Sequence, residues 1–174
     1  MNTCKILMAI GGLGGGIEEE YFELGMQMGP DLIAADAGST DSGPAYLANA
    51  MCKTSRHMLK HDLEIMVKGS REANIPIMIG SCGTCGSDSG VEEIAEIVTE
   101  ILNEHGYHAK IAKVYSEVQR DLLKEKFAEG KIHALEGKEP SLYVAEVKVR
   151  GITKPEPLTE HITQMAGIVS AVAL

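Results

Sequence analysis

The chain has no long apolar run. Among its 174 residues, no apolar stretch approaches the ~18 consecutive residues that a membrane-spanning helix needs. The longest candidate is the stretch Met165–Leu174 at the C-terminus. A signal peptide is also missing, because Ile6–Ile10 follows one basic residue, Lys5, and continues directly into glycines. These absences exclude a membrane-spanning protein and predict a cytoplasmic one.

Basic residues are few. Sixteen lysines and arginines stand against 25 acidic residues, which gives a net charge of −9 and an isoelectric point near 5.1. Such a negative field disfavours nucleic acid and a lipid surface as partners. Cysteine is also sparse, with four residues, and in a chain without a secretion signal these predict reduced thiols. Glycine is abundant instead, and the 19 glycines are clustered.

Short apolar runs alternate with segments of helical periodicity four times along the chain. The runs predict buried strands at Lys5–Ile10, Leu32–Ala35, Ile75–Ile79 and Ala109–Tyr115. Between and after them, apolar residues recur at helical spacing, predicting helices over about 17–28, 55–73, 89–102 and 116–128. In the second of these helices, Leu59, Leu63, Met66 and Val67 form the expected inner stripe.

This alternation is typical of a parallel sheet with right-handed crossovers. We therefore expect an α/β fold with a doubly wound, mostly parallel sheet and helices on both faces. No linker or repeat divides the sequence, so residues 1–174 are expected to form a single domain. Within it, residues 131–174 should add an edge strand near 143–150 and a C-terminal helix over about 158–168.

Three glycine-rich and hydroxyl-rich loops follow the first three predicted strands. Because parallel strands end at one edge of a sheet, these loops should gather there, joined by Glu117 after the fourth strand. Backbone amides of glycine loops at helix N-termini favour an anion, either a carboxylate or a phosphate. The candidate binding residues on these loops are Gly12, Gly14, Gly38, Ser39, Thr40, Ser81 and Gly83. The alternative is that glycine only allows the loops to turn tightly.

The glycine pattern does not match known nucleotide motifs. A dinucleotide fingerprint would require a third glycine where Gly12-Leu13-Gly14 places Ile17, and no Gly-Lys-Ser/Thr follows any strand. A non-catalytic module that binds an anion or a nucleotide therefore stays an alternative rather than the preferred interpretation.

The second loop carries two carboxylates. Asp36 and Asp41 flank Gly38-Ser39-Thr40, and two carboxylates in different environments can divide acid and base roles or bind a divalent cation. Asp88 on the third loop is a further catalytic candidate. The alternative is that these polar groups only stabilise a turn.

Two further features of the sequence are open to more than one interpretation. Cys82 and Cys85 form a C-x-x-C between a strand and a helix, which suits a redox pair, a nucleophilic thiol or two small buried thiols. Arg56 stands at a helix start, where a cation is unfavourable, and is either a clamp for a ligand carboxylate or a surface charge.

Three blocks of residues resemble the N-terminal domain of the acyclic terpene utilisation family. They are Ile33–Leu47, which contains Asp-Ala-Gly-Ser-Thr-Asp, then Thr54-Ser55-Arg56, then Ile75–Ser81. The resemblance covers about residues 4–130. It implies a role in the catabolism of branched or unsaturated carboxylic acids, some of them as CoA thioesters.

The chain departs from that family in two respects. Family members carry small residues where Cys82 and Cys85 stand, and they continue beyond this length. Together with the apolar C-terminal stretch, the second departure predicts a homo-oligomer or a complex with a second subunit.

The sequence as a whole predicts a cytosolic enzyme or substrate-binding subunit for a small carboxylate or acyl thioester. Lyase, hydratase or hydrolase chemistry would use Asp36 and Asp41 as the acid and base. Substrate would be held by the hydroxyls and backbone amides of the loops, with Arg56 as the counter-charge. The alternatives are the anion-binding or nucleotide-binding module and a protein that depends on the Cys82–Cys85 thiols. The cofactor remains open, a divalent cation being one option.

Overall fold

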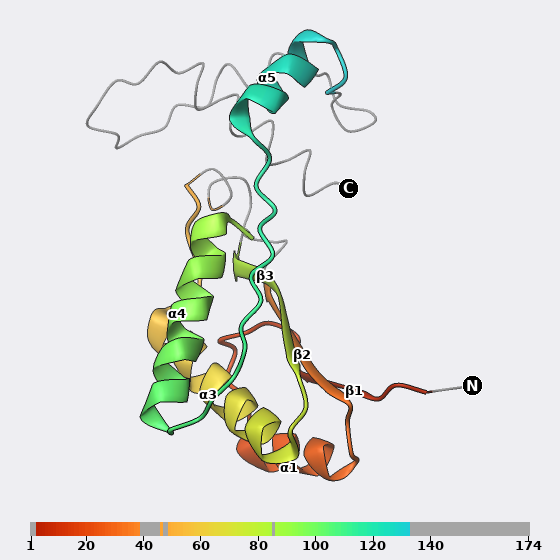
Figure 1. The fold of residues 1–174 in the computed structure, drawn as a ribbon, viewed down its shortest axis with the longest axis vertical. Coiled ribbons are helices and arrows are strands. Elements are labelled where there is room, and N and C mark those ends of the chain that lie inside the picture. The colour runs from red at the N-terminus through yellow and green to blue at the C-terminus, as the bar shows by residue number, and fades with distance from the viewer. Residues whose placement is uncertain (1–2, 39–45, 47–48, 85, 133–174) are drawn as a thin grey trace.

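A computed structural model describes residues 3–38, 46, 49–84 and 86–132 (Figure 1). The edge strand and C-terminal helix expected within 133–174 therefore lie outside the described residues. The strands are β1 (Ile6–Ile10), β2 (Leu32–Gly38) and β3 (Ile77–Thr84). The helices are α1 (Glu19–Gln27), α3 (Arg56–Ala73), α4 (Asp88–Glu104) and α5 (Arg120–Ala128). None of the described helices is both long enough and apolar enough to cross a membrane.

The three strands form one parallel sheet in the order β1-β2-β3. In the register, Ile33 of β2 is the partner of Leu7 on one side and of Ile77 on the other. Each crossover contains a helix, as parallel neighbours require. The prediction of an α/β fold built on a parallel sheet is confirmed.

The core lies between the sheet and helices α3 and α4. The expected stripe of α3 is confirmed, since Leu59, Leu63, Met66 and Val67 are all buried. They pack with Ile33 of β2 and with Ile94, Ile97 and Ile101 of α4. A serine caps the N-terminus of each of these two helices: the Ser55 hydroxyl accepts from Met58 N, and the Ser87 hydroxyl accepts from Gly90 N.

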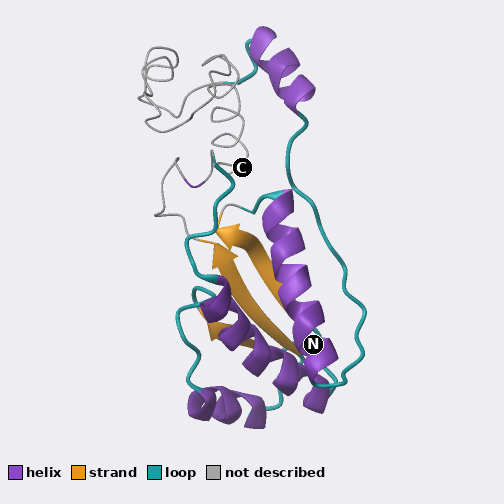
Figure 2. Ribbon diagram, turned by 90° about the vertical axis from the view of Figure 1, so that its left-hand side faces the viewer, coloured by secondary structure: helices purple, strands orange, loops and turns teal. Residues whose placement is uncertain are grey.

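In the layering of the described helices, the structure differs from the expected arrangement. Helices α3 and α4 lie on one side of the sheet, and α1 packs on Leu7 of β1 and on α3 from that same side (Figures 1 and 2). Successive right-handed crossovers in the order β1-β2-β3 place their helices on one face. On the opposite face Ile6, Met8 and Met78 are 56%, 57% and 62% exposed. Among the described residues, then, helices do not cover both faces.

The prediction of a fourth strand is wrong. Ala109–Tyr115 is an extended segment without strand pairing, and it runs past α4 and β3 towards α5 (Figure 1). The ammonium of Lys113 and the hydroxyl of Tyr115 both bind the carboxylate of Glu92 on α4. These side-chain bonds hold the segment to the helix layer rather than to the open edge of β3.

Candidate functional site

The loops that follow the three strands meet at one edge of the sheet. The amide of Leu13 in the first loop donates to the carbonyl oxygen of Asp36 at 2.7 Å. The amide of Lys53, at the end of the connection after β2, donates to Thr84 Oγ1 at 2.8 Å. Four candidate residues from the sequence, Ser39, Thr40, Asp41 and Cys85, lie outside the described residues.

A buried carboxylate of the protein itself occupies the first glycine loop. Asp62 Oδ2 accepts from the amides of Gly14 at 2.7 Å and Gly16 at 3.2 Å, and Oδ1 accepts from Ile17 at 2.8 Å. The Asp62 side chain is fully buried. Gly12 contributes its carbonyl oxygen to the turn, accepting from Gly15 N. The loop therefore binds a carboxylate, as its glycines suggest, but Gly14 already holds one that comes from α3.

The second and third loops bring together Asp36, Gly38 and Ser81. A Cβ atom added to Gly38 would lie 3.0 Å from Asp36 Oδ1 and 3.1 Å from Ser81 Oγ. The same Cβ would also collide with the Cβ of Ser81, so the absent side chain of Gly38 is what allows the carboxylate and the hydroxyl to lie this close together. Gly38 N donates to Asp36 Oδ1 at 2.7 Å, which fixes the carboxylate on its strand.

Two non-glycine residues of β3 at this edge have left-handed backbone conformations. Ser81 has a φ of 49° and Thr84 a φ of 73°. Such conformations cost on the order of 1–3 kcal/mol each and occur preferentially at functional sites. Ser81 is exposed, whereas Thr84 is buried and holds the Lys53 amide. The strained turn thus presents the Ser81 hydroxyl beside Asp36.

Lys53 supplies a cation at this edge that sequence reasoning missed. Its backbone is bonded to Thr84, the residue opposite Gly38 in the sheet register. Within the described part of the chain, the Lys53 ammonium forms no ion pair. Sequence reasoning missed Asp62 as well. Its position next to Leu63, on the apolar side of α3, could have indicated that its carboxylate is buried.

Arg56, the expected counter-charge, binds another group. Its Nη2 lies 2.9 Å from Glu100 Oε2, and Lys60 Nζ lies 2.7 Å from both Glu100 and Glu104. Hydrogen bonds from Lys60 and then Arg56 hold the pKa of Glu100 below its ordinary value, and these carboxylates raise the pKa of Lys60. The cluster joins α3 to α4, so a carboxylate of the protein already engages the Arg56 guanidinium.

Asp88 and Glu117 bind each other at the start of α4. Asp88 N donates to Glu117 Oε1 at 2.8 Å, and Glu117 N donates to Asp88 Oδ1 at 3.3 Å. Ser116 Oγ donates to the carbonyl oxygen of Gly86 next to them. Glu117 thus places a carboxylate at the positive end of the helix, where an anionic ligand would otherwise bind.

Cys82 and Gly83 form the part of the third loop that packs against α4. The Cys82 thiol donates to the carbonyl oxygen of Ile79 at 3.8 Å, and burial raises the pKa of this thiol. A reactive thiol requires the opposite shift. Gly83 has a φ of 70°, and a Cβ there would lie 2.9 Å from the Cα of Gly90. Among the described residues, no three His, Cys, Asp or Glu side chains form a metal-binding group.

Comparisons with known proteins found no relative of this chain. No family model matches it, and neither a curated protein nor a solved structure shows significant similarity to it. The resemblance to the acyclic terpene utilisation family therefore remains a prediction from the sequence blocks. The geometry at the carboxyl edge of the sheet is what supports a functional proposal.

Proposed function

We propose that the carboxyl edge of the sheet binds a small carboxylate or acyl thioester and that Asp36 transfers a proton to or from it. The observation that carries this proposal is the close approach of the Asp36 carboxylate and the Ser81 hydroxyl beside Gly38, where both residues are exposed to solvent. A lyase, hydratase or hydrolase reaction needs such a proton-transfer group within reach of the substrate.

The three groups at this edge suit different tasks. Asp36 Oδ1 accepts the Gly38 amide, while Oδ2 accepts no hydrogen bond from the described residues and can exchange a proton. The Ser81 hydroxyl can donate to a substrate oxygen. The Lys53 ammonium can balance the negative charge of a carboxylate or a thioester enolate. As the second carboxylate of the acid–base pair we retain Asp41, which lies outside the described residues.

The alternatives have less support from the described residues. Asp62 and Glu117 already occupy the amides of the first loop and the start of α4, where a nucleotide phosphate would be expected to bind. Burial of Cys82 raises its pKa, which disfavours a thiolate mechanism at that residue. The divalent cation remains an option for the second loop, with Asp36 as one oxygen ligand.

Ligand binding and turnover test this proposal separately. Small carboxylates and acyl-CoA thioesters are added to the purified chain, and a ligand at 100 times its Kd should stabilise the fold by about 2.7 kcal/mol in thermal unfolding. Asp36→Asn should remain folded and keep binding but lose turnover, whereas Lys53→Met should weaken binding. Asp121→Asn, on exposed α5, is the matched control. Turnover that survives Asp36→Asn contradicts the proposal.

We also propose a cytoplasmic protein that acts with a second copy of itself or with a second subunit. Cys4, Cys52 and Cys82 are free thiols, which suits a reducing compartment. The exposed Ile6, Met8 and Met78 form an apolar sheet face, and parallel sheets normally have both faces covered. Light scattering after gel filtration should give a mass above 18.6 kDa for the isolated chain if a second copy covers this face. A monomeric mass would contradict the homo-oligomer and leave only a complex with a second subunit.

A further inference from the structure

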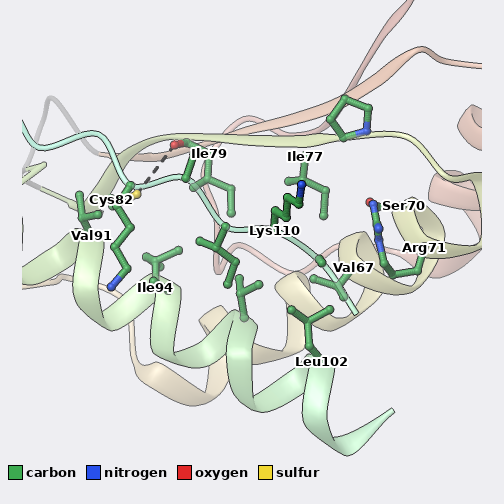
Figure 3. A pocket seen from close by; sticks show the side chains of 17 residues that line it. Val67, Ser70, Arg71, Ile77, Ile79, Cys82, Val91, Ile94, Leu102 and Lys110 are labelled. Carbon is green, nitrogen blue, oxygen red and sulfur yellow. Dashed lines mark hydrogen bonds between the residues drawn. The ribbon is translucent and has the colours of Figure 1, made fainter. Parts of the chain in front are cut away.

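A cavity of about 410 Å³ lies on the helix side of the sheet, and neither Asp36 nor Ser81 lines it. Its walls are β3, α4 and the extended segment 109–113, and Ile77, Ile79, Ile94 and Val98 contribute apolar side chains to it. Figure 3 shows Cys82 at one end and Arg71 at the other. The volume falls in the range of small-molecule sites, roughly 300–1,000 Å³.

Arg71 is a cation at this cavity that has no acidic partner within the described part of the chain. Its Nη2 donates to Ser70 Oγ at 3.1 Å and to the Ile75 carbonyl oxygen at 3.2 Å. Among the residues that the structure describes, no carboxylate pairs with its guanidinium, although the chain carries nine more acidic than basic groups. Lys110 also lines the cavity and likewise forms no ion pair with a described residue.

The guanidinium group has a planar fork of donors that matches a carboxylate. An arginine at one end of an apolar cavity therefore complements a molecule with one carboxylate and an aliphatic chain. We propose that this cavity binds an aliphatic monocarboxylate, with the carboxylate on Arg71 and the chain extending along Ile77 and Ile79 towards Cys82. This proposal does not rest on the proposed function, because the cavity shares no lining residue with the Asp36–Ser81 edge.

Calorimetric titration of the full chain with octanoate tests the proposal. Octanoate should bind saturably, and octan-1-ol, which has the same chain but no carboxylate, should bind at least tenfold more weakly. Arg71→Met should weaken octanoate binding at least tenfold, because it removes a charge-assisted hydrogen bond. Arg120→Met, which alters an exposed arginine on α5, is the matched control and should change nothing. Lys53→Met, which should weaken binding at the Asp36–Ser81 edge, should leave octanoate binding to this cavity unchanged, and this result separates the two sites.

A second measurement uses the thiol that lines the cavity. Octanoate should slow alkylation of Cys82 by iodoacetamide several-fold, whereas the exposed Cys4 should react at an unchanged rate; peptide mass spectrometry distinguishes the two. This experiment needs no variant and so remains decisive if Arg71→Met fails to fold. Equal binding of octanoate and octanol, an absence of binding, or protection of both cysteines would each overturn the proposal.

Discussion

Replacing Asp62 by Asn tests whether a buried carboxylate organises the first glycine loop. The substitution preserves shape but converts one oxygen acceptor into an NH₂ donor. In the native protein the two carboxylate oxygens accept three backbone amides, from Gly14, Gly16 and Ile17. Because an asparagine has only one side-chain acceptor, at least one amide loses its partner and faces another donor.

The expected cost follows from those lost bonds. A hydrogen bond to a charged group contributes about 1.5–3 kcal/mol, and a buried donor without a partner costs about 1–3 kcal/mol. We therefore expect Asp62→Asn to lower the free energy of unfolding by about 4 kcal/mol. That is a large part of the 5–15 kcal/mol typical of a domain of this size.

Urea denaturation followed by circular dichroism measures this change. With a slope of about 2 kcal/mol per molar urea, the unfolding midpoint should fall by about 2 M. Asp121→Asn, on the exposed surface of α5, makes the same chemical change and should alter stability by no more than about 0.5 kcal/mol. If the two variants lose similar stability, the loop does not depend on Asp62 and the reasoning is refuted.

Three smaller predictions concern packing and titration. Gly90→Ala should destabilise the protein by about 2 kcal/mol, because its Cβ would collide with the carbonyl oxygen of Cys82 on β3. A Cβ on Gly80 would meet no atom within 4 Å, so Gly80→Ala should not cause such a loss, and urea denaturation of the two variants compares them. Iodoacetamide at pH 8 should alkylate Cys82 more slowly than the exposed Cys4, because burial raises the pKa of Cys82; equal rates would argue against this. Hydrogen bonds from a lysine and a histidine hold the pKa of Glu64 below 4.5, so its contribution to stability is present above that pH and is lost in more acidic solution. Glu64→Gln should reduce the loss of unfolding free energy as the pH falls, which urea denaturation at several acidic pH values measures. An unchanged pH dependence in the variant would contradict the role of Glu64.

Sequence periodicity predicted most of the fold because local patterns determine it. The apolar runs gave three strands, and the spacing of Leu59, Leu63 and Met66 gave the buried face of α3. The prediction of a fourth strand was wrong because sequence periodicity does not show tertiary contacts. Ala109–Tyr115 is rich enough in apolar residues to suggest a strand, but Lys113 and Tyr115 bind Glu92 on α4, a contact set by tertiary structure.

The candidate site was predictable only in part. The order of strands and loops correctly placed Asp36, Gly38 and Ser81 at one edge, since parallel strands share a carboxyl end. The partners of the charged residues were not predictable, because they come from distant parts of the chain. Arg56 binds Glu100, 44 residues away, and Asp62 binds amides of Gly14 and its neighbours, 45 to 48 residues away.

These intramolecular partners indicate which of the three loops can still bind a ligand. A glycine loop or helix start that already binds a carboxylate of the protein cannot offer the same amides to a ligand. Asp62 satisfies the first loop in this way, and Glu117 occupies the start of α4. The junction of the second and third loops differs, because Asp36 and Ser81 lie side by side there and both are exposed to solvent. A ligand at this edge is therefore expected to contact side chains of β2 and β3 rather than the amides that the glycine pattern first suggested.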